Sequence, residues 1–542
     1  MPTCGERLVE LLQDYGVEIV FGIPGNHTVE LYRGLASSSI RHVSPRHEQG
    51  AGFMADGYAR ASGRPGVCFL ISGPGLTNAM TPMMQALADS IPMLVITAVA
   101  ARHQLGMGEG HLHDLPNQNA LAGQCSRFSH TLMRPDELPR ILARAFAVFS
   151  SERPGPVHIE IPLDVITADA GTVSPLRWPT CLPPSANEEA ISAARDMILA
   201  AERPCIIAGG GAVNAGPQLR AIAEQLNAPL VNTVNAKGVL PLSHPLAVGG
   251  SPSVPAVRQL LGQADVVLAV GTEFGETDYD MLFLGELHLT GKLIRIDIDA
   301  QQLCRNLRPD LAICGDASAS LAALNKALSA VGHEADAVHA TSERVADTRA
   351  AIRAEAHFHG EFQAFFDTIQ EALPGLVLVG DSTLPTYYAV WQYEPAGPRQ
   401  YFHSATGGGT LGYAIPAALG AKLARPDVPV VALIGDGSAQ FTLPELAAGV
   451  AAGLPVVVIV WNNDGYREIK QGMVASDITP VGVDISPPDF IAAARAMGCA
   501  AERPDDLEVL KIALQSAAKR SVPTLLELEQ SLFISQPAGQ WY

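Results

Sequence analysis

The sequence predicts an α/β protein made of three doubly wound parallel-sheet domains. The chain has 542 residues, enough for about three domains of ordinary size. Apolar runs of strand length alternate with helical segments in each third of the chain. Two polar stretches interrupt this alternation. We therefore expect domains at residues 1–172, 187–331 and 362–532, linkers at 173–186 and 332–361, and a C-terminal tail at 533–542.

The first two thirds of the chain contain regularly spaced strand and helix patterns. We expect helices at residues 8–15, 50–60 and 77–89, and strands at 18–21, 67–71, 93–98, 205–208, 266–270 and 293–298. A glycine run, Gly209 to Gly211, follows the first strand of the central domain, as in nucleotide-binding turns. Val213 and Asn214 do not complete a GxGxxG motif. The sequence therefore leaves nucleotide binding by the central domain open.

Two polar signals follow neighbouring strands in the last third of the chain. Apolar strands are expected at residues 430–434 and 456–460, joined by a helix at about 444–453. Asp436 and Asn463 follow the two strands and are 27 residues apart. Strands joined by such a crossover helix lie side by side in a parallel sheet, so we expect both residues at the same sheet edge.

Oxygen ligands at this edge predict a magnesium-diphosphate site. Mg²⁺ binds one or two protein oxygens and completes an octahedral shell with phosphate oxygens and water. The Asp436 carboxylate, the Asn463 amide oxygen and the Gly465 carbonyl fit this need. Gly435 and Gly437 have no side chain, so a diphosphate can come close to the backbone there. Residues 438–442, which begin with Ser438, are expected to open a helix whose amino end favours anions.

The composition argues against several classes of function. The 36 basic and 55 acidic residues give a formal net charge of −19, without long runs of one sign. This balance argues against nucleic acid or an anionic membrane as the main partner. The sequence shows no leader-like or membrane-spanning apolar run, so we expect a cytoplasmic protein. The eight cysteines form no CxxC pair and are expected to be reduced thiols.

The strand-end signals resemble the signature of thiamine-diphosphate-dependent enzymes. The segment from Arg46 to Arg60, RHEQGAGFMADGYAR, is similar to the catalytic glutamate segment of the same family. The resemblance extends over nearly the whole chain and implies thiamine diphosphate and Mg²⁺ as cofactors. It also implies a pyrimidine-binding first domain, a Rossmann-like central domain and a diphosphate-binding third domain.

The resemblance implies that Glu48 is the catalytic carboxyl group. In this family such a group shares a proton with N1′ of the aminopyrimidine, which promotes the imino tautomer that deprotonates C2 of the thiazolium. Desolvation raises the pKa of a carboxyl group and eases such sharing near neutral pH. The alternative is an ordinary glutamate in the first turn of a helix.

Further cofactor contacts are implied by the same resemblance. The Gly409 carbonyl would accept from the 4′-amino group, and Leu411 would separate the two rings and enforce the bent cofactor. Pro24 and Gly25 would lie beside the aminopyrimidine, and Asn78 would belong to the loop that faces the reacting carbon. The residues of a further loop on the diphosphate side are Asp381, Ser382 and Thr383.

The resemblance also implies an oligomer. Glu48 lies in the first predicted domain and Asp436 in the third. In this family the two residues at one cofactor come from different subunits. We therefore expect a homodimer as the minimum and a homotetramer as the usual assembly.

Within the family, residues 27–35 and 46–60 are most similar to 2-ketoarginine decarboxylase-like enzymes of the acetolactate-synthase-like branch. This implies a lyase that decarboxylates 5-guanidino-2-oxopentanoate or another long-chain 2-oxoacid without oxidation, through an enamine at C2. The alternative is a carboligase, in which the same enamine attacks a second carbonyl compound. The intact Glu48, Asp436 and Asn463 argue against a regulatory protein without turnover.

Two departures from better-known relatives concern the proton donor. Glu468 lies five residues beyond Asn463, whereas pyruvate-decarboxylase-like enzymes have a glutamate at the position of Ile469. The resemblance therefore does not assign proton donation to this segment. His113 stands where acetolactate synthases have the glutamine of a Phe-Gln-Glu triplet. Its imidazole could protonate the carbon left after loss of carbon dioxide, or could cap a loop carbonyl.

Acidic residues bear on the substrate and on a possible flavin. Glu109, Asp114 and Glu468 are expected near the pocket mouth, where a guanidinium or ammonium group could pair with them. The acidic stretch at residues 272–280 is a poor neighbour for a flavin diphosphate. We therefore expect no FAD, although the branch contains flavin-bearing members.

Overall fold

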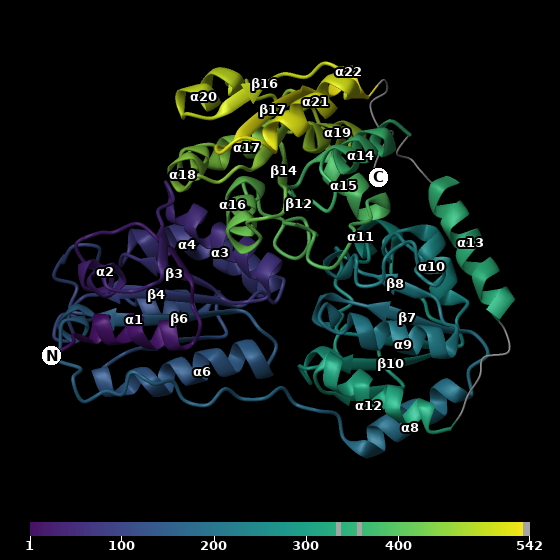
Figure 1. The fold of residues 1–542 in the computed structure, drawn as a ribbon, viewed down its shortest axis with the longest axis horizontal. Coiled ribbons are helices and arrows are strands. Elements are labelled where there is room, and N and C mark those ends of the chain that lie inside the picture. Colours follow the sequence, from purple (N-terminus) through teal and green to yellow (C-terminus); the bar gives the residue numbers. More distant parts are fainter. Residues whose placement is uncertain (332–337, 355–359, 535–542) are drawn as a thin grey trace.

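The protein contains three parallel sheets with helices on both faces of each (Figure 1). The computed structural model describes residues 1–331, 338–354 and 360–534. Of the predicted second linker, residues 332–337 and 355–359 lie outside the described residues. Of the predicted tail, residues 535–542 do. In Figure 1 the N-terminal domain is purple and blue, the central domain teal, and the C-terminal domain green to yellow. The predicted fold class is confirmed.

The N-terminal sheet has six strands in the order β2-β1-β3-β4-β6-β5. Its strands are β1 (Ile19–Gly22), β2 (Arg41–Val43), β3 (Gly66–Leu70), β4 (Met93–Val99), β5 (Phe128–Thr131) and β6 (Pro156–Pro162). Its helices are α1 (Cys4–Asp14), α2 (Val29–Ala36), α3 (Glu48–Ser62), α4 (Pro74–Ala88), α5 (Gln118–Gly123), α6 (Leu138–Ser151) and α7 (Leu163–Ile166). Val67 and Phe69 enter a core with α1 and α6, whereas Cys68 and Leu70 enter a core with α3 and α4. Both faces are therefore buried, as in doubly wound sheets.

The central sheet has five strands in the order β11-β10-β9-β7-β8. Its strands are β7 (Pro204–Ala208), β8 (Leu230–Asn232), β9 (Val266–Val270), β10 (Lys292–Asp297) and β11 (Leu311–Cys314). The helices of this region are α8 (Glu188–Leu199), α9 (Gly216–Leu226), α10 (Pro255–Gly262), α11 (Met281–Leu284), α12 (Ala317–Ser329) and α13 (Val338–Ala354). A side chain on Gly209 would lie 2.2 Å from the Gly271 carbonyl oxygen. The glycine run therefore has a packing role between the ends of β7 and β9.

The C-terminal sheet has six strands in the order β13-β12-β14-β15-β17-β16. Its strands are β12 (Val377–Gly380), β13 (Tyr401–His403), β14 (Val430–Gly435), β15 (Val457–Asn462), β16 (Ala500–Glu502) and β17 (Thr524–Glu529). Its helices are α14 (Gly360–Ala372), α15 (Leu384–Gln392), α16 (Ala414–Ala424), α17 (Asp436–Thr442), α18 (Glu445–Ala452), α19 (Arg467–Ala475), α20 (Phe490–Ala496), α21 (Leu507–Ala517) and α22 (Gln530–Phe533). The predicted pairing of β14 with β15 is confirmed, with Gly435 opposite Trp461. Helix α17 begins at Asp436, two residues earlier than predicted, because Gly435 is extended and Asp436 already takes the first helical position.

Helices α3 and α16 join the N-terminal domain to the C-terminal domain (Figure 1). A side chain on Gly57 would lie 2.0 Å from the Ala417 carbonyl oxygen, and one on Gly420 would lie 1.9 Å from the Met54 carbonyl oxygen. Only glycine permits so close an approach of two backbones. The pairing of 57 with 417 and of 54 with 420 makes the two helices antiparallel.

A buried polar group fixes one end of this helix pair. The Arg60 guanidinium lies 2.6 Å from an Asp56 oxygen, and the Tyr413 hydroxyl donates to Asp56 at 2.5 Å. Arg60 also lies 2.6 Å from Asp89 of the segment after α4. Such paired charges tolerate burial because each has partners. Tyr413, just before α16, is thereby fixed to the carboxyl end of α3.

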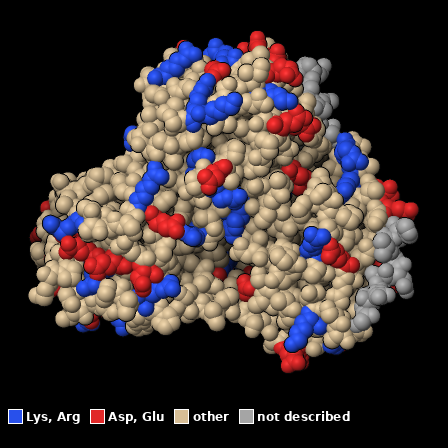
Figure 2. Space-filling view, viewed as in Figure 1, with Lys and Arg blue, Asp and Glu red and all other residues tan. Residues whose placement is uncertain are grey.

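The surface and helix lengths bear on possible partners. Figure 2 shows acidic and basic side chains interspersed on the face in view, without a large area of one sign. In the part of the chain that the structure describes, no helix has the length and apolar character needed to cross a membrane.

Candidate active site

Three oxygen atoms converge where β14 and β15 end. Asp436 opens α17 and is 1% exposed, and Asn463 and Gly465 follow β15. The Asn463 amide oxygen lies 3.2 Å from Asp436 Oδ1 and 3.0 Å from the Gly465 carbonyl oxygen. Asp436 Oδ2 accepts a hydrogen bond of 2.8 Å from the Gly465 N–H. Asp436 Oδ1 accepts only a long hydrogen bond of 3.4 Å from the Asn463 N–H, so this oxygen can still bind a cation.

Trp461 and Gln530 set the orientation of the Asn463 amide. The buried Trp461 indole donates to Gln530 Oε1 at 2.9 Å, and an indole N–H can only donate. Gln530 Oε1 is therefore an acceptor, and Asn463 Nδ2 donates to it at 3.3 Å. The amide oxygen of Asn463 consequently points toward Asp436.

This oxygen cluster fits a magnesium ion. Oxygens this close repel one another unless a cation lies between them. In an octahedral Mg²⁺ shell with bonds of about 2.1 Å, neighbouring oxygens are about 3.0 Å apart, and the two distances here are 3.0 and 3.2 Å. Among the described residues no three His, Cys, Asp or Glu side chains gather as a metal site, so the all-oxygen cluster is the candidate for a hard cation.

A cavity of about 480 Å³ opens beside these oxygens, a size typical of small-molecule sites. The predicted site residues that line it are Ser382, Thr383, Gly409, Leu411, Gly435, Asp436, Gly437, Ser438, Asn463 and Gly465. Lining residues that were not predicted include Tyr387, Tyr466, Arg467 and Gln530. Gln530 directly follows β17, which pairs with β15. The same strand-end rule that pointed to Asn463 could therefore have pointed to Gln530.

Asp381, which belongs to the predicted loop on the diphosphate side, lies behind the cavity wall and does not line the cavity. Its side chain is fully buried. Asp381 Oδ1 accepts from the Ser438 hydroxyl at 2.5 Å, and Oδ2 accepts from the Ala414 N–H at 3.0 Å. Burial raises the pKa of Asp381 to about 6. The structure therefore gives Asp381 a supporting position, which holds Ser438 and the start of α16.

Gly409 and Leu411 belong to the β13–α16 loop, residues 404–413. Gly409 has a φ of +60°, a conformation that favours glycine, and a side chain there would meet nothing within 4 Å. At the end of the loop, the Gly412 N–H donates to Ser438 Oγ at 2.7 Å. The Gly412 carbonyl accepts from Thr442 Oγ1 at 2.7 Å. The last part of the loop is thus fixed to α17.

Glu468 lines the cavity from α19. Burial raises the pKa of its carboxyl group to about 7. Of the three acids expected at the pocket mouth, only Glu468 lines this cavity. Glu109 is exposed, and its carboxylate lies 3.4 Å from His111 Nε2. Asp114 belongs to the same loop of the N-terminal domain as Glu109. A desolvated carboxyl group gains much from a neighbouring cation, because the ionised form is otherwise disfavoured.

Glu48 is the first residue of α3, at the carboxyl edge of the N-terminal sheet. Glu48 Oε2 accepts from Asn78 Nδ2 at 2.9 Å. The backbone before Glu48 is held by Glu445, whose carboxylate accepts from the N–H groups of Arg46 and His47 at 3.0 Å. Burial raises the pKa of Glu445 to about 7. Glu445 was not predicted, because it is 398 residues from His47 and no local pattern connects them.

Other predicted residues gather at the same edge. Pro24 and Gly25 follow β1, and Gly25 packs so closely on Ile71 that a side chain would lie 2.5 Å from it. His113 has a φ of +60°, and its Nδ1 is buried without a hydrogen-bond partner among the described residues. The His113 ring lies 5.3 Å from that of His27. His27 was not predicted as a site residue.

The two groups of predicted residues lie apart within one chain. Every residue that lines the 480 Å³ cavity belongs to the C-terminal domain. Glu48 is at the amino end of α3, about 18 Å along the helix from Arg60. The Arg60 end of α3 is the one that packs against Tyr413 and the β13–α16 loop. Glu48 therefore lies at the end of α3 remote from its own chain's loop.

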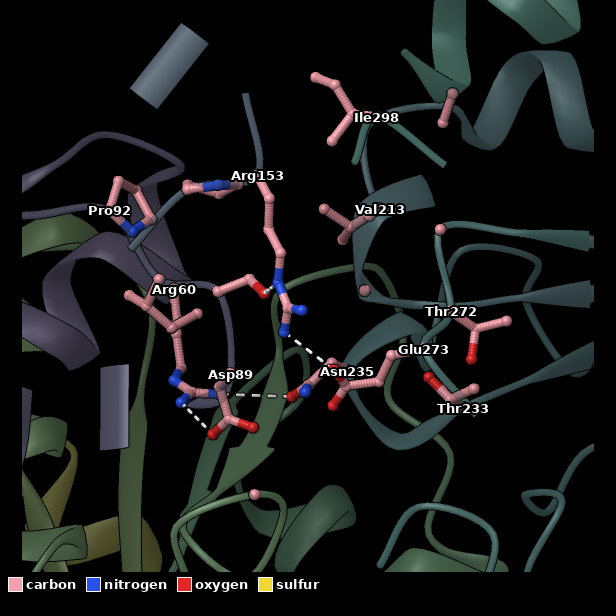
Figure 3. A pocket seen from close by; sticks show the side chains of 18 of the residues that line it. Arg60, Asp89, Pro92, Arg153, Val213, Thr233, Asn235, Thr272, Glu273 and Ile298 are labelled. Atoms are coloured by element: carbon pink, nitrogen blue, oxygen red, sulfur yellow. Dashed lines mark hydrogen bonds and ion pairs between the residues drawn. The ribbon is translucent and has the colours of Figure 1, made fainter. Parts of the chain in front are cut away.

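A second cavity, of about 330 Å³, lies where the three domains meet. Figure 3 shows Arg60 bonded to Asp89 and Asn235, and Arg153 bonded to Glu273. The acidic stretch at 272–280 contributes Asp278 to the lining, and burial raises the pKa of Asp278 to about 7. The absence of a flavin stays a prediction.

Comparisons with known proteins agree with this geometry. Three family models match: "Thiamine pyrophosphate enzyme, N-terminal TPP binding domain" over residues 2–121, the central domain over 191–324, and the "C-terminal TPP binding domain" over 379–528. The chain is 46% identical to a "Probable 2-ketoarginine decarboxylase AruI" of Pseudomonas aeruginosa, over 98% of this chain and 94% of that one. It is 34% identical to acetolactate synthase isozyme 1 large subunit of Escherichia coli, over 86% and 83%. It is 32% identical to an acetolactate synthase of Mycobacterium bovis, over 97% and 87%.

Proposed function

The chain belongs to the thiamine pyrophosphate enzyme family, and we propose that it is a Mg²⁺-dependent decarboxylase of a 2-oxoacid with a long cationic side chain. The substrate class that we favour is exemplified by 5-guanidino-2-oxopentanoate. The name of the Pseudomonas aeruginosa relative, 46% identical over 98% of the chain, supports this class. Thiamine pyrophosphate is the same compound as thiamine diphosphate.

The residues at the C-terminal cavity would hold the cofactor. Asp436, Asn463 and the Gly465 carbonyl would bind Mg²⁺, and Gly437 and Ser438 would lie against the diphosphate. When bound, thiamine diphosphate supplies a nucleophilic carbon and an electron sink for decarboxylation. The protein's own task is to bind the ion, orient the cofactor and exclude water.

The N-terminal group of residues would complete the site of a second chain. Glu48, held by Asn78 and remote from its own loop, would face the cofactor bound to Asp436 of another copy. A two-fold dimer would then contain two equal sites. Exposed apolar side chains on both groups support such a contact: Val29 and Leu112 on one, Ile469 and Val481 on the other. A tetramer would be a pair of such dimers.

The observation that supports a cationic substrate is the partly exposed Glu468 carboxyl in the cavity wall, whose pKa is raised by desolvation. Charge-assisted pairing with a desolvated carboxylate is worth about 1.5–3 kcal/mol. That corresponds to about a ten- to hundredfold preference over an uncharged side chain. His113 is our candidate for the proton donor that completes aldehyde formation.

The alternative is carboligation, favoured by the acetolactate synthases among the relatives. The two activities differ in whether the reacting carbon takes a proton or attacks a second carbonyl group. Product analysis separates them. The purified protein is incubated with 5-guanidino-2-oxopentanoate, with and without thiamine diphosphate and Mg²⁺, and with and without an added aldehyde. Cofactor-dependent carbon dioxide and one equivalent of aldehyde support the lyase, whereas an acyloin or acetohydroxyacid as the main product would contradict it.

A further inference from the structure

Gln85, on α4 of the N-terminal domain, is bonded to both sides of the β13–α16 loop. It is fully buried. Its Nε2 donates to the Thr406 carbonyl at 3.0 Å. Its Oε1 accepts from the Thr410 hydroxyl at 2.8 Å and from the Thr410 N–H at 3.3 Å. Gly409 lies between these two threonines, and Leu411 follows them.

Asp89 fixes which way the Gln85 amide faces. Gln85 Nε2 also donates to Asp89 Oδ2 at 2.7 Å, and the same oxygen accepts from Arg60 at 2.6 Å. An ionised carboxylate only accepts hydrogen bonds, so the amide nitrogen must face Asp89 and the amide oxygen must face Thr410. All four hydrogen-bonding positions of the Gln85 amide are therefore used, and three of them bear on the loop.

The loop lies so close to α4 that its own sequence is constrained. A side chain on Gly408 would lie 2.5 Å from Gln85 Oε1. A side chain on Gly407 would lie 2.9 Å from Ala88, and Gly407 has a φ of +63°. The contact is therefore closely packed as well as hydrogen-bonded, and the loop conformation depends on it.

We propose that Gln85 is a positioning residue that holds the β13–α16 loop so that the Gly409 carbonyl and the Leu411 side chain face the cofactor. This role rests on the proposed function, because it concerns the shape of the bound thiamine diphosphate. The Asp436 edge and the end of the loop at Gly412 are fixed separately, by the C-terminal domain. Loss of Gln85 would therefore misplace the cofactor's aminopyrimidine while leaving its diphosphate bound.

The test uses Gln85→Leu, which keeps most of the volume and removes every hydrogen bond. Thr410→Val removes only the hydroxyl donor and is the second variant if Gln85→Leu does not fold. The control is Gln370→Leu, which removes the 3.0 Å hydrogen bond that Gln370 Nε2 donates to the Glu394 carbonyl in the C-terminal domain. Three quantities are measured: backbone hydrogen exchange of peptides from residues 404–413 without cofactor, calorimetric affinity for thiamine diphosphate with Mg²⁺, and hydrogen–deuterium exchange at C2 of the bound cofactor.

We expect faster backbone exchange of the loop in Gln85→Leu and an intermediate rate in Thr410→Val. Cofactor affinity should stay within about threefold, because the diphosphate site is separate. C2 exchange should fall at least about tenfold, because alignment of the base with C2 is lost. A double variant that combines Gln85→Leu with Thr410→Val should lose no more C2 exchange than Gln85→Leu alone, because both changes break the same contact. Gln370→Leu should match the parent in all three.

Two outcomes would overturn the proposal. One is a loop whose backbone exchange is unchanged in both variants. The other is a lower melting temperature with unchanged C2 exchange, which would make Gln85 only a contact between domains. Failure of the proposed function looks different: the parent protein itself would then show no cofactor-dependent C2 exchange, whereas the loop exchange without cofactor would still report on Gln85.

Discussion

At the scale of single residues, the site depends on groups whose orientation is fixed by neighbours. The Asn463 amide oxygen faces Asp436 because the Trp461 indole makes Gln530 an acceptor. Strand-end reasoning predicted Asp436, Asn463 and Gly465, since the ligand-bearing edge of a parallel sheet is readable from the sequence. It could not predict how the amide is turned, because that depends on a side chain 67 residues away.

The first prediction concerns Glu48. Glu48→Gln should keep the Asn78 contact and bind the cofactor, but an amide cannot share a proton with the aminopyrimidine. Hydrogen–deuterium exchange at C2 of bound thiamine diphosphate should fall at least about a hundredfold, the usual effect of losing a general acid or base. Gln49→Glu in the same helix turn, which leaves residue 48 intact, serves as a control. Exchange equal to that of the parent would make Glu48 a structural residue.

The second prediction concerns Glu468 and pH. Because burial raises the pKa of this carboxyl group to about 7, its anionic form increases as the pH rises from 6 to 8. The kcat/KM for a guanidino 2-oxoacid, relative to that for its uncharged isostere, should therefore rise over this range. In Glu468→Gln the relative efficiency should drop about ten- to hundredfold and lose its pH dependence. Equal kcat/KM values for both substrates in the parent would contradict the cationic assignment.

At the scale of helices and strands, long-range contacts set the elements that carry the site. The predicted strands of the core were recognisable from their apolar runs, whereas β2, β13 and β16 have three residues each and are too short for a periodic pattern. The amino end of α3 is likewise fixed by Glu445 of α18, from the other end of the sequence. Local patterns therefore predicted the helix but not what holds it.

The third prediction follows from the pKa of Glu445, which burial raises from 4.5 to about 7. Between these pH values the folded protein retains a proton that the unfolded chain has lost. The stability contributed by this group is present below pH 4.5 and is lost as the pH rises through 7. The loss amounts to about 3 kcal/mol. Glu445→Gln should abolish this part of the pH dependence.

The measurement is urea unfolding of the parent and of Glu445→Gln at several pH values. Other buried acids with raised pKa values, such as Asp278 and Asp381, affect both proteins equally. The difference between the two unfolding free energies isolates Glu445. A difference that does not change between pH 4.5 and 7 would refute the assignment.

At the scale of the whole molecule, the separation of Glu48 from the C-terminal cavity is the observation on which the proposed dimer rests. The antiparallel pairing of α3 with α16 places Glu48 at the remote end of α3. The sequence predicted the three-domain fold from repeated strand and helix patterns. The packing of α3 against α16 could not be predicted, because it depends on two glycine contacts between segments more than 350 residues apart in the sequence.

The fourth prediction is that mixed dimers regain activity. Glu48→Gln and Asp436→Ala should each be inactive alone. In a mixed dimer one site receives Glu48 from one chain and Asp436 from the other, both intact. The purified mixed dimer, with one intact site of two, should therefore have about half of the parent's activity. Co-expression with two affinity tags, followed by assay of the doubly purified dimer, checks this. No recovery in a dimer that contains both chains would place the whole site within one chain.

The account depends most on the cofactor site at Asp436, Asn463 and Gly465, and one calorimetric titration tests it directly. Thiamine diphosphate is titrated into the parent and into Asp436→Ala, each with and without Mg²⁺. The parent should bind only with Mg²⁺. Asp436→Ala should remain folded and lose at least about a hundredfold in affinity, because the diphosphate keeps its charge while the ion loses its anionic protein ligand. Unchanged Mg²⁺-dependent affinity in Asp436→Ala would contradict the account.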